Sequence, residues 1–159
     1  MKLSFVPVTA LILGVARLGQ AQTATQTVTF QVDAINDLSV SGTPSLVINS
    51  SNSGSAPSSA TSAGHTWAVT TNQTGAKVTA SIGSDMPAGL TLSAVLSAPS
   101  GANSAGLKAL STTPVDVVTA ISKLNASGLG LSYQLDATAA AGVVPSTTRV
   151  VTYTITGGV

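Results

Sequence analysis

The chain has 159 residues, of which six are Lys or Arg and five are Asp or Glu, and it contains no cysteine. This length is enough for one domain with its own hydrophobic core. The lack of cysteine excludes disulfides, thiolate metal sites and a cysteine lipid anchor. The few, balanced charges leave no basic patch for nucleic acid or anionic lipid, and a surface so poor in charge favours self-association.

Residues 1–21 have the composition of a secretion signal peptide. Lys2 supplies a short positive region, an apolar run follows, and Gly19-Gln20-Ala21 is a small-x-small cleavage site. The run is too short and too interrupted for a stable membrane span, which disfavours the alternative of an uncleaved anchor helix. We expect residues 22–159 to be exported as a single β-sandwich domain, with no integral membrane association.

An alternation of apolar and polar residues marks the segment 27–40, TVTFQVDAINDLSV. Such a period of two is typical of a strand with one buried face. A strand of this length would reach roughly 45 Å, whereas a typical strand has about five or six residues. The segment therefore either bends near residues 35–37 and stays in its own domain, or its first part, 27–34, belongs with the preceding residues to a donor or edge strand, 22–34. Both alternatives keep Leu38 and Val40 in the home core. The apolar phase consists of Val28, Phe30, Val32, Ala34, Leu38 and Val40.

The rest of the chain is predicted to form short strands separated by turn residues. The ranges 66–71 and 76–82 flank Asn72-Gln73-Thr74-Gly75 and are expected to form a hairpin. Together the strands predict an all-β fold, an antiparallel immunoglobulin-like β-sandwich of about seven to nine strands with one short helix. The other expected strands are 45–49, 90–96, 107–110, 129–137 and 148–156.

Two segments depart from the strand pattern. Residues 50–64 are rich in Ser, Ala, Gly and Asn, and are predicted to form a long flexible loop. Residues 113–124 begin with Thr113 as a potential cap and Pro114 at the first helical position. Their apolar residues then share one helical face, which predicts the short helix.

Few residues suggest catalysis or metal binding. The single histidine, His65, is expected to be a solvated loop residue, and no G-x-S-x-G elbow or paired acids accompany it. Asp33, Asn36 and Asp37 could offer oxygens to a calcium ion, but polar residues that satisfy a bent backbone are the stronger interpretation. We predict a non-catalytic protein without a cofactor or a metal.

The aromatic residues favour a core over a sugar-binding surface. Beyond the predicted signal peptide there are four, Phe30, Trp67, Tyr133 and Tyr153, and all lie in the inward phase of their predicted strands. Large rings in that phase usually pack inside a domain.

The export signal is followed at once by a polar leader and then by TVTFQV. An alternating segment near a free N-terminus can pair with the open edge of another subunit, with Val28, Phe30 and Val32 as the interface side chains. Together with the closing segment TRVVTYTIT, this resembles the donor-strand fimbrial and biofilm-matrix fibre subunits, which are small secreted sandwiches. The resemblance implies a polymer of identical subunits outside the cell, and the lack of cysteine fits matrix-fibre subunits better than chaperone–usher pilins.

The alternative function is a monomeric secreted binding module, for a polysaccharide or as a surface adhesin. A secreted hydrolase would need His65 or two aspartates to converge in a cleft.

Overall fold

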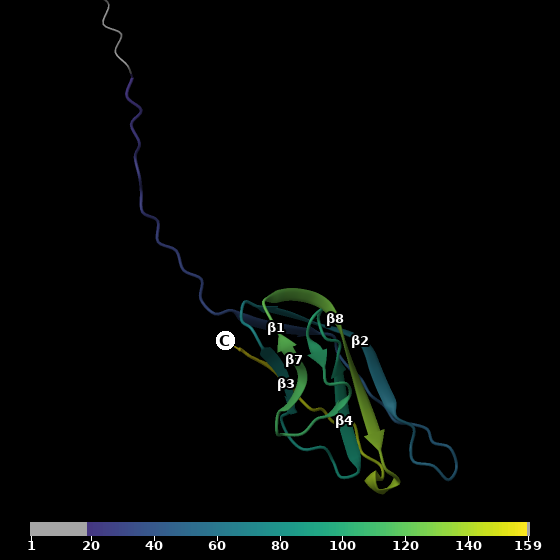
Figure 1. The fold of residues 1–159 in the computed structure, drawn as a ribbon. Coiled ribbons are helices and arrows are strands. Elements are labelled where there is room, and N and C mark those ends of the chain that lie inside the picture. Colours follow the sequence, from purple (N-terminus) through teal and green to yellow (C-terminus); the bar gives the residue numbers. More distant parts are fainter. Residues whose placement is uncertain (1–18, 159) are drawn as a thin grey trace, which may run out of the picture. The chain divides into compact units, whose positions relative to one another are not determined.

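The structure, a computed structural model, describes residues 19–158, which belong to two units. The first unit ends at Val32, and the second, called the sandwich unit below, is Asp33–Val159. Residues 19–32 lie outside any helix or strand, and their side chains are exposed (Figure 1). Most of the predicted signal peptide, residues 1–18, lies outside the described residues.

The sandwich unit is built from two antiparallel sheets (Figure 1), so the predicted all-β sandwich is confirmed. The five-stranded sheet has the order β1 (Asn36–Ser41), β2 (Ala60–Thr71), β8 (Leu124–Ala137), β4 (Leu90–Leu96) and β6 (Lys108–Ala109). The four-stranded sheet has the order β5 (Asn103–Ser104), β7 (Val115–Ile121), β3 (Ala76–Ile82) and β9 (Val151–Thr156). Within residues 19–158 the helical content is one 3-10 turn, Ala139–Ala141.

One hydrophobic core lies between the sheets, and it is built from alternate residues of the strands. The inward positions predicted for β2, β3 and β4 are confirmed. The largest side chain, Trp67, is 1% exposed, and its indole N–H donates to the Ser97 carbonyl over 3.1 Å. The other large, fully buried side chains are Leu96, Ile121, Val69, Val78, Val117 and Val118.

The helix predicted over 113–124 is wrong, because Val115–Ile121 forms β7. The register between β3 and β7 shifts twice, and each shift inserts one extra residue into β7. Ala120 takes a positive φ of 59° in this strand. Such bulges break the period of two, so the consecutive residues Val117 and Val118 are both buried. The resulting spacing of apolar residues imitates a helical face.

The predicted hairpin over 66–82 is also wrong. β2 pairs with β1 and β8, whereas β3 pairs with β7 and β9. The turn at 72–75, closed by Gly75 with φ 77°, therefore carries the chain from one sheet to the other. The local sequence cannot distinguish a hairpin from a crossing between sheets. Apolar and polar residues alternate in the same way in two strands that pair side by side and in two strands that face each other across a core.

The chain between β1 and β2 differs from its predicted form as well. Residues 42–50 lie outside any strand, although Leu46 and Ile48 are half-buried and Val47 is exposed, as the alternation predicts. The following loop is shorter than expected, because β2 already begins at Ala60. Val40, predicted in the core, is 48% exposed, whereas Leu38 packs against the core.

Candidate strand-acceptor groove

A groove of about 830 Å³ runs into the sandwich unit between two extended segments. One wall is residues 44–51, which follow β1, and the other is residues 144–149, which lead into β9. Both walls lie outside the sheets, apart from an isolated bridge between Ser51 and Pro57. Apolar and tyrosine side chains form the floor: Met86, Leu90, Leu92, Tyr133, Leu135, Ala137 and Val151.

Most of the backbone of both walls is available for pairing, although the Ser50 carbonyl accepts from the Ser58 N–H and the Thr148 carbonyl accepts from the Arg149 side chain. Within the described part of the chain, residues 44–49 and 143–149 form no backbone–backbone hydrogen bond. β1 pairs only with β2, and β9 pairs only with β3, so each is an edge strand. The two edge strands contact each other across the sheets, which places both open edges on the same side of the unit. Open edges of this kind offer N–H and C=O groups to an added strand.

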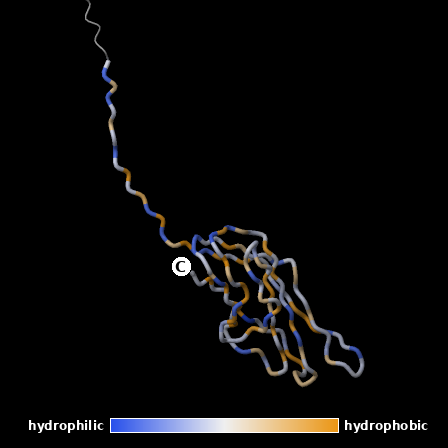
Figure 2. Tube along the Cα trace, viewed as in Figure 1, coloured by the Kyte–Doolittle hydropathy of each residue, from blue (hydrophilic) through white to orange (hydrophobic). Residues whose placement is uncertain are grey.

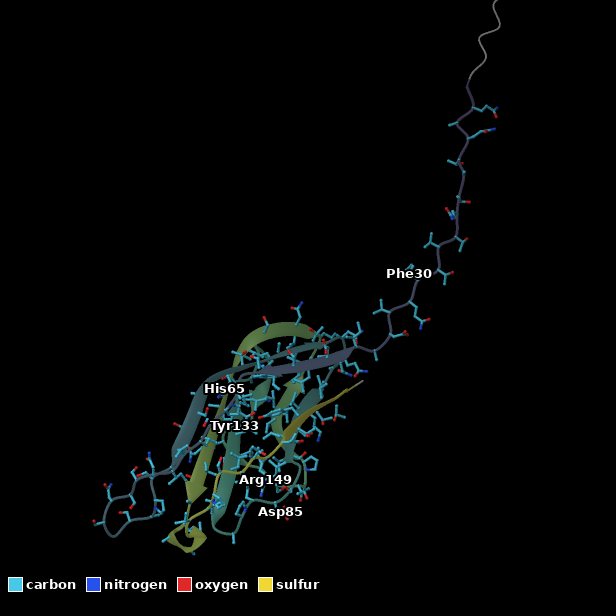
Figure 3. All side chains as sticks on the ribbon, turned by 180° about the vertical axis from the view of Figure 1, so that it is seen from behind. Phe30, His65, Asp85, Tyr133 and Arg149 are labelled. Carbon is cyan, nitrogen blue, oxygen red and sulfur yellow. The ribbon has the colours of Figure 1, made fainter. Side chains whose placement is uncertain are left out.

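One arginine holds the wall that leads into β9. The Arg149 guanidinium donates to the Asp85 carbonyl through Nε and Nη2, over 3.0 and 2.9 Å, and to the Thr148 carbonyl through Nη1 over 2.8 Å (Figure 3). Several donors in a fixed planar fork restrict the position of this segment. Arg149 is also the sole Lys, Arg, Asp or Glu among the lining residues, so the groove is almost uncharged.

Two tyrosines join the sheets beneath the groove. The Tyr153 hydroxyl on β9 donates to the Tyr133 hydroxyl on β8 over 3.0 Å. His65 lies edge-on to the Tyr133 ring, with centroids 5.9 Å apart, and its Nε2 is 2.8 Å from the Ser62 hydroxyl (Figure 3). The prediction of a solvated loop histidine is therefore wrong, because His65 is a half-buried residue of β2. Its contacts support the floor of the groove.

Replacing Tyr153 by phenylalanine is expected to weaken the loss of stability in alkali. Burial, and then the hydrogen bond with Tyr133, raise the pKa of Tyr153 above its ordinary value. Above about pH 10 the unfolded chain releases this proton while the folded chain keeps it, so the free energy of unfolding falls as pH rises. Urea unfolding at about pH 8 and about pH 11 measures the fall. Equal falls in the wild type and in Tyr153→Phe would contradict the prediction.

The predicted interface residues Val28, Phe30 and Val32 belong to the first unit. Their side chains are 71%, 88% and 77% exposed, and the segment that carries them is not a strand of the sandwich. Figure 2 shows the alternation of hydrophobic and hydrophilic residues along this segment. Phe30 is the exception among the four aromatic residues beyond the predicted signal peptide, since Trp67 and Tyr133 are buried and Tyr153 is half-buried.

Asn72 holds the beginning of the sandwich unit in place. Its side-chain oxygen accepts from the Ile35 N–H over 2.8 Å, and its amide donates to the Asp33 carbonyl over 2.7 Å. The Asn72 N–H also donates to the Ile35 carbonyl over 3.3 Å. The sequence pattern placed Asn72 in a turn. This role was not visible there because the partners lie far apart along the chain.

Asn36 and Asp37, two of the three calcium candidates, do not point to a common site. Asn36 accepts from the Thr71 hydroxyl over 2.8 Å, and its amide donates to Gln73 over 2.7 Å. Asp37, the next residue of β1, points to the opposite face of the strand. Residues 19–158 hold no group of three His, Cys, Asp or Glu side chains that could bind a metal.

Fold and groove together define the class of protein. It is an all-β protein of two antiparallel sheets, with a groove that has an apolar floor and mostly unpaired walls. Comparison of the chain with protein-family models, curated proteins and solved structures finds no match.

The described residues include no helix long and apolar enough to cross a membrane.

Proposed function

We propose that this protein is a secreted, non-catalytic structural protein that assembles into a fibre or surface matrix by N-terminal strand addition. One observation carries the proposal. The same chain has an exposed alternating segment with three large apolar side chains and a groove with an apolar floor between two mostly unpaired walls. The segment lacks a cover for its apolar face, and the groove lacks a strand.

Approximate energies make this assembly reasonable. Burying Val28, Phe30 and Val32 is worth about 5–9 kcal/mol in total, at about 1.5–3 kcal/mol each. Association costs about 4–15 kcal/mol in lost translational and rotational freedom. Main-chain hydrogen bonds to the two walls, worth about 0.5–1.5 kcal/mol each, therefore decide whether the polymer is stable.

We further propose that the sandwich is immunoglobulin-like. Strands β1, β2, β8 and β4 follow the side-by-side order of the A, B, E and D strands of that fold. β3 and β9 then correspond to the C and F strands, and the position beyond β9, where a G strand would pair, is open. An added strand from another copy would occupy this position.

Electron microscopy of residues 22–159, beside a variant that lacks residues 22–33, tests the proposed function. We expect regular filaments for the longer protein and none for the shortened variant, because the latter keeps the groove but has no donor segment. Circular dichroism and urea unfolding check that the shortened variant is folded. Discrete monomers in both samples at every concentration would contradict self-assembly and would favour the monomeric binding module.

A further inference from the structure

We infer that Tyr133 and Tyr153 form a modification site, at which one-electron oxidation joins their rings by a carbon–carbon bond, a dityrosine crosslink between the two sheets of one copy. The inference does not depend on assembly, because it concerns two side chains of a single molecule. It follows from the number of tyrosines in the chain, the contact between their hydroxyls and their position beside the groove.

The two tyrosines meet between the sheets. They are the only tyrosines in the 159-residue sequence, and their positions differ by 20. Tyr133 lies on β8 of the five-stranded sheet and Tyr153 lies on β9 of the four-stranded sheet, yet their hydroxyl oxygens are 3.0 Å apart. The carbons that form a dityrosine bond are the ring carbons next to the one that bears the hydroxyl. Hydroxyls in contact therefore place the reactive ends of both rings beside each other.

The reaction needs only the two phenols and an oxidant. A small one-electron oxidant removes one electron from each tyrosine, and each hydroxyl releases its proton to solvent. The unpaired electron of a tyrosyl radical is shared with the ring carbons next to the hydroxyl-bearing carbon, so a bond forms between one such carbon of each ring. The hydrogens of those two carbons then move to the oxygens and restore both phenols. In total the pair loses two electrons and two protons, and two equivalents of oxidant are each reduced by one electron.

The groove gives a small oxidant access to this pair. Tyr133 belongs to the groove floor and is 7% exposed, and Tyr153 is half-buried. The volume of about 830 Å³ beside the Tyr133 ring leaves space for the small rotation that brings the ring carbons together. The indole ring of Trp67, which is also easily oxidised, is 1% exposed and does not line the groove. Burial shields both tyrosine rings from other copies, which favours a bond within one copy.

The crosslink would fasten a strand that has few other restraints. β9 pairs only with β3, and the segment before it is held by Arg149. A chain without cysteine cannot make a disulfide across its sheets. A bond between Tyr133 and Tyr153 closes a loop between positions that differ by 20. By the chain-entropy argument used for disulfides, such a loop lowers the ratio of unfolded to folded protein by about a hundredfold.

Photochemical oxidation of the purified protein tests the inference. Light-excited tris(bipyridyl)ruthenium with persulfate supplies the one-electron oxidant, and free tyrosine oxidised in parallel confirms that the reagent is active. Trypsin cleaves after Lys123 and Arg149, so it separates Tyr133, in residues 124–149, from Tyr153, in residues 150–159. We expect mass spectrometry to find these two peptides joined, with the loss of two hydrogen atoms, in protein that runs as a monomer on a denaturing gel.

Two controls distinguish a crosslink within one copy from a crosslink between copies. In an equal mixture of unlabelled and isotopically heavy protein, the joined peptides should both be light or both be heavy. Tyr133→Phe and Tyr153→Phe each remove one phenol and should give no joined peptides, with circular dichroism as the check that they are folded. The oxidised wild type should also unfold at a higher urea concentration than the oxidised variants. Joined peptides that are mainly mixed in label, or no joined peptides under conditions that couple free tyrosine, would overturn the inference.

Discussion

Replacing Phe30 by aspartate is expected to raise the concentration needed for assembly by at least about a hundredfold, since every 1.4 kcal/mol corresponds to a factor of ten. Phe30 is 88% exposed in the free chain, so the sandwich loses nothing by the change. In the groove, the variant would forfeit about 1.5–3 kcal/mol of apolar burial and would also have to desolvate a carboxylate. Light scattering and sedimentation of the polymer measure the threshold concentration.

Thr29→Asp is the matched control for Phe30→Asp. It places the same charge on the same exposed segment, but on the opposite face of the alternation. We expect its threshold to stay within a few fold of the wild type. An equal rise in threshold concentration for both variants would mean that assembly depends on the charge of the segment and not on burial of the Phe30 side chain. Unchanged assembly of Phe30→Asp would contradict strand addition through this face.

Replacing Trp67 by alanine is expected to lower the free energy of unfolding by about 3–5 kcal/mol, the range for large aromatic residues in a core. Trp67 is 1% exposed, and its loss would leave a cavity between the sheets and an unpaired carbonyl at Ser97. A loss of this size is a large part of the about 5–15 kcal/mol that stabilises a typical domain. Urea unfolding followed by circular dichroism measures the change.

Two further variants serve as controls for the effect of Trp67→Ala on stability. Val143→Ala changes a side chain that is 99% exposed, and should alter stability by no more than about 0.5 kcal/mol. Trp67→Phe keeps most of the buried area and removes the hydrogen bond to Ser97, so its stability should lie between those of the wild type and Trp67→Ala. A destabilisation of Trp67→Ala below about 1 kcal/mol would contradict the central position of this residue in the core.

We therefore expect stability and assembly to depend on different residues. A Trp67 variant should weaken the sandwich itself, whereas a Phe30 variant should leave the sandwich intact and remove the proposed contact with another copy. Observing both effects independently would show that the apolar face of the segment 27–34 serves association and not the fold.

The amino-acid sequence was sufficient to identify which side chains of most strands face inward. Trp67, Val78, Leu92 and Leu131 are all buried as their alternation predicts, because the direction of a side chain within a regular strand is a local property with a period of two. The sequence also marked the segment 27–34 as unusual, since its apolar phase continues well beyond the length of a typical strand.

Pairing partners were decided only in the folded chain. Whether the turn at 72–75 joins neighbours in one sheet or crosses between sheets depends on β8 and β9, which lie far along the sequence. The bulges of β7 likewise arise from its register with β3, and they turned a strand pattern into an apparent helix.

The groove is the clearest product of tertiary structure. Its walls, residues 44–51 and 144–149, are separated by most of the chain, and neither has a motif. They lie opposite each other only because β1 and β9 occupy neighbouring edges of two different sheets. The proposed donor segment is marked by local alternation, whereas the proposed acceptor groove depends on non-local packing and exists only when both sheets are in place.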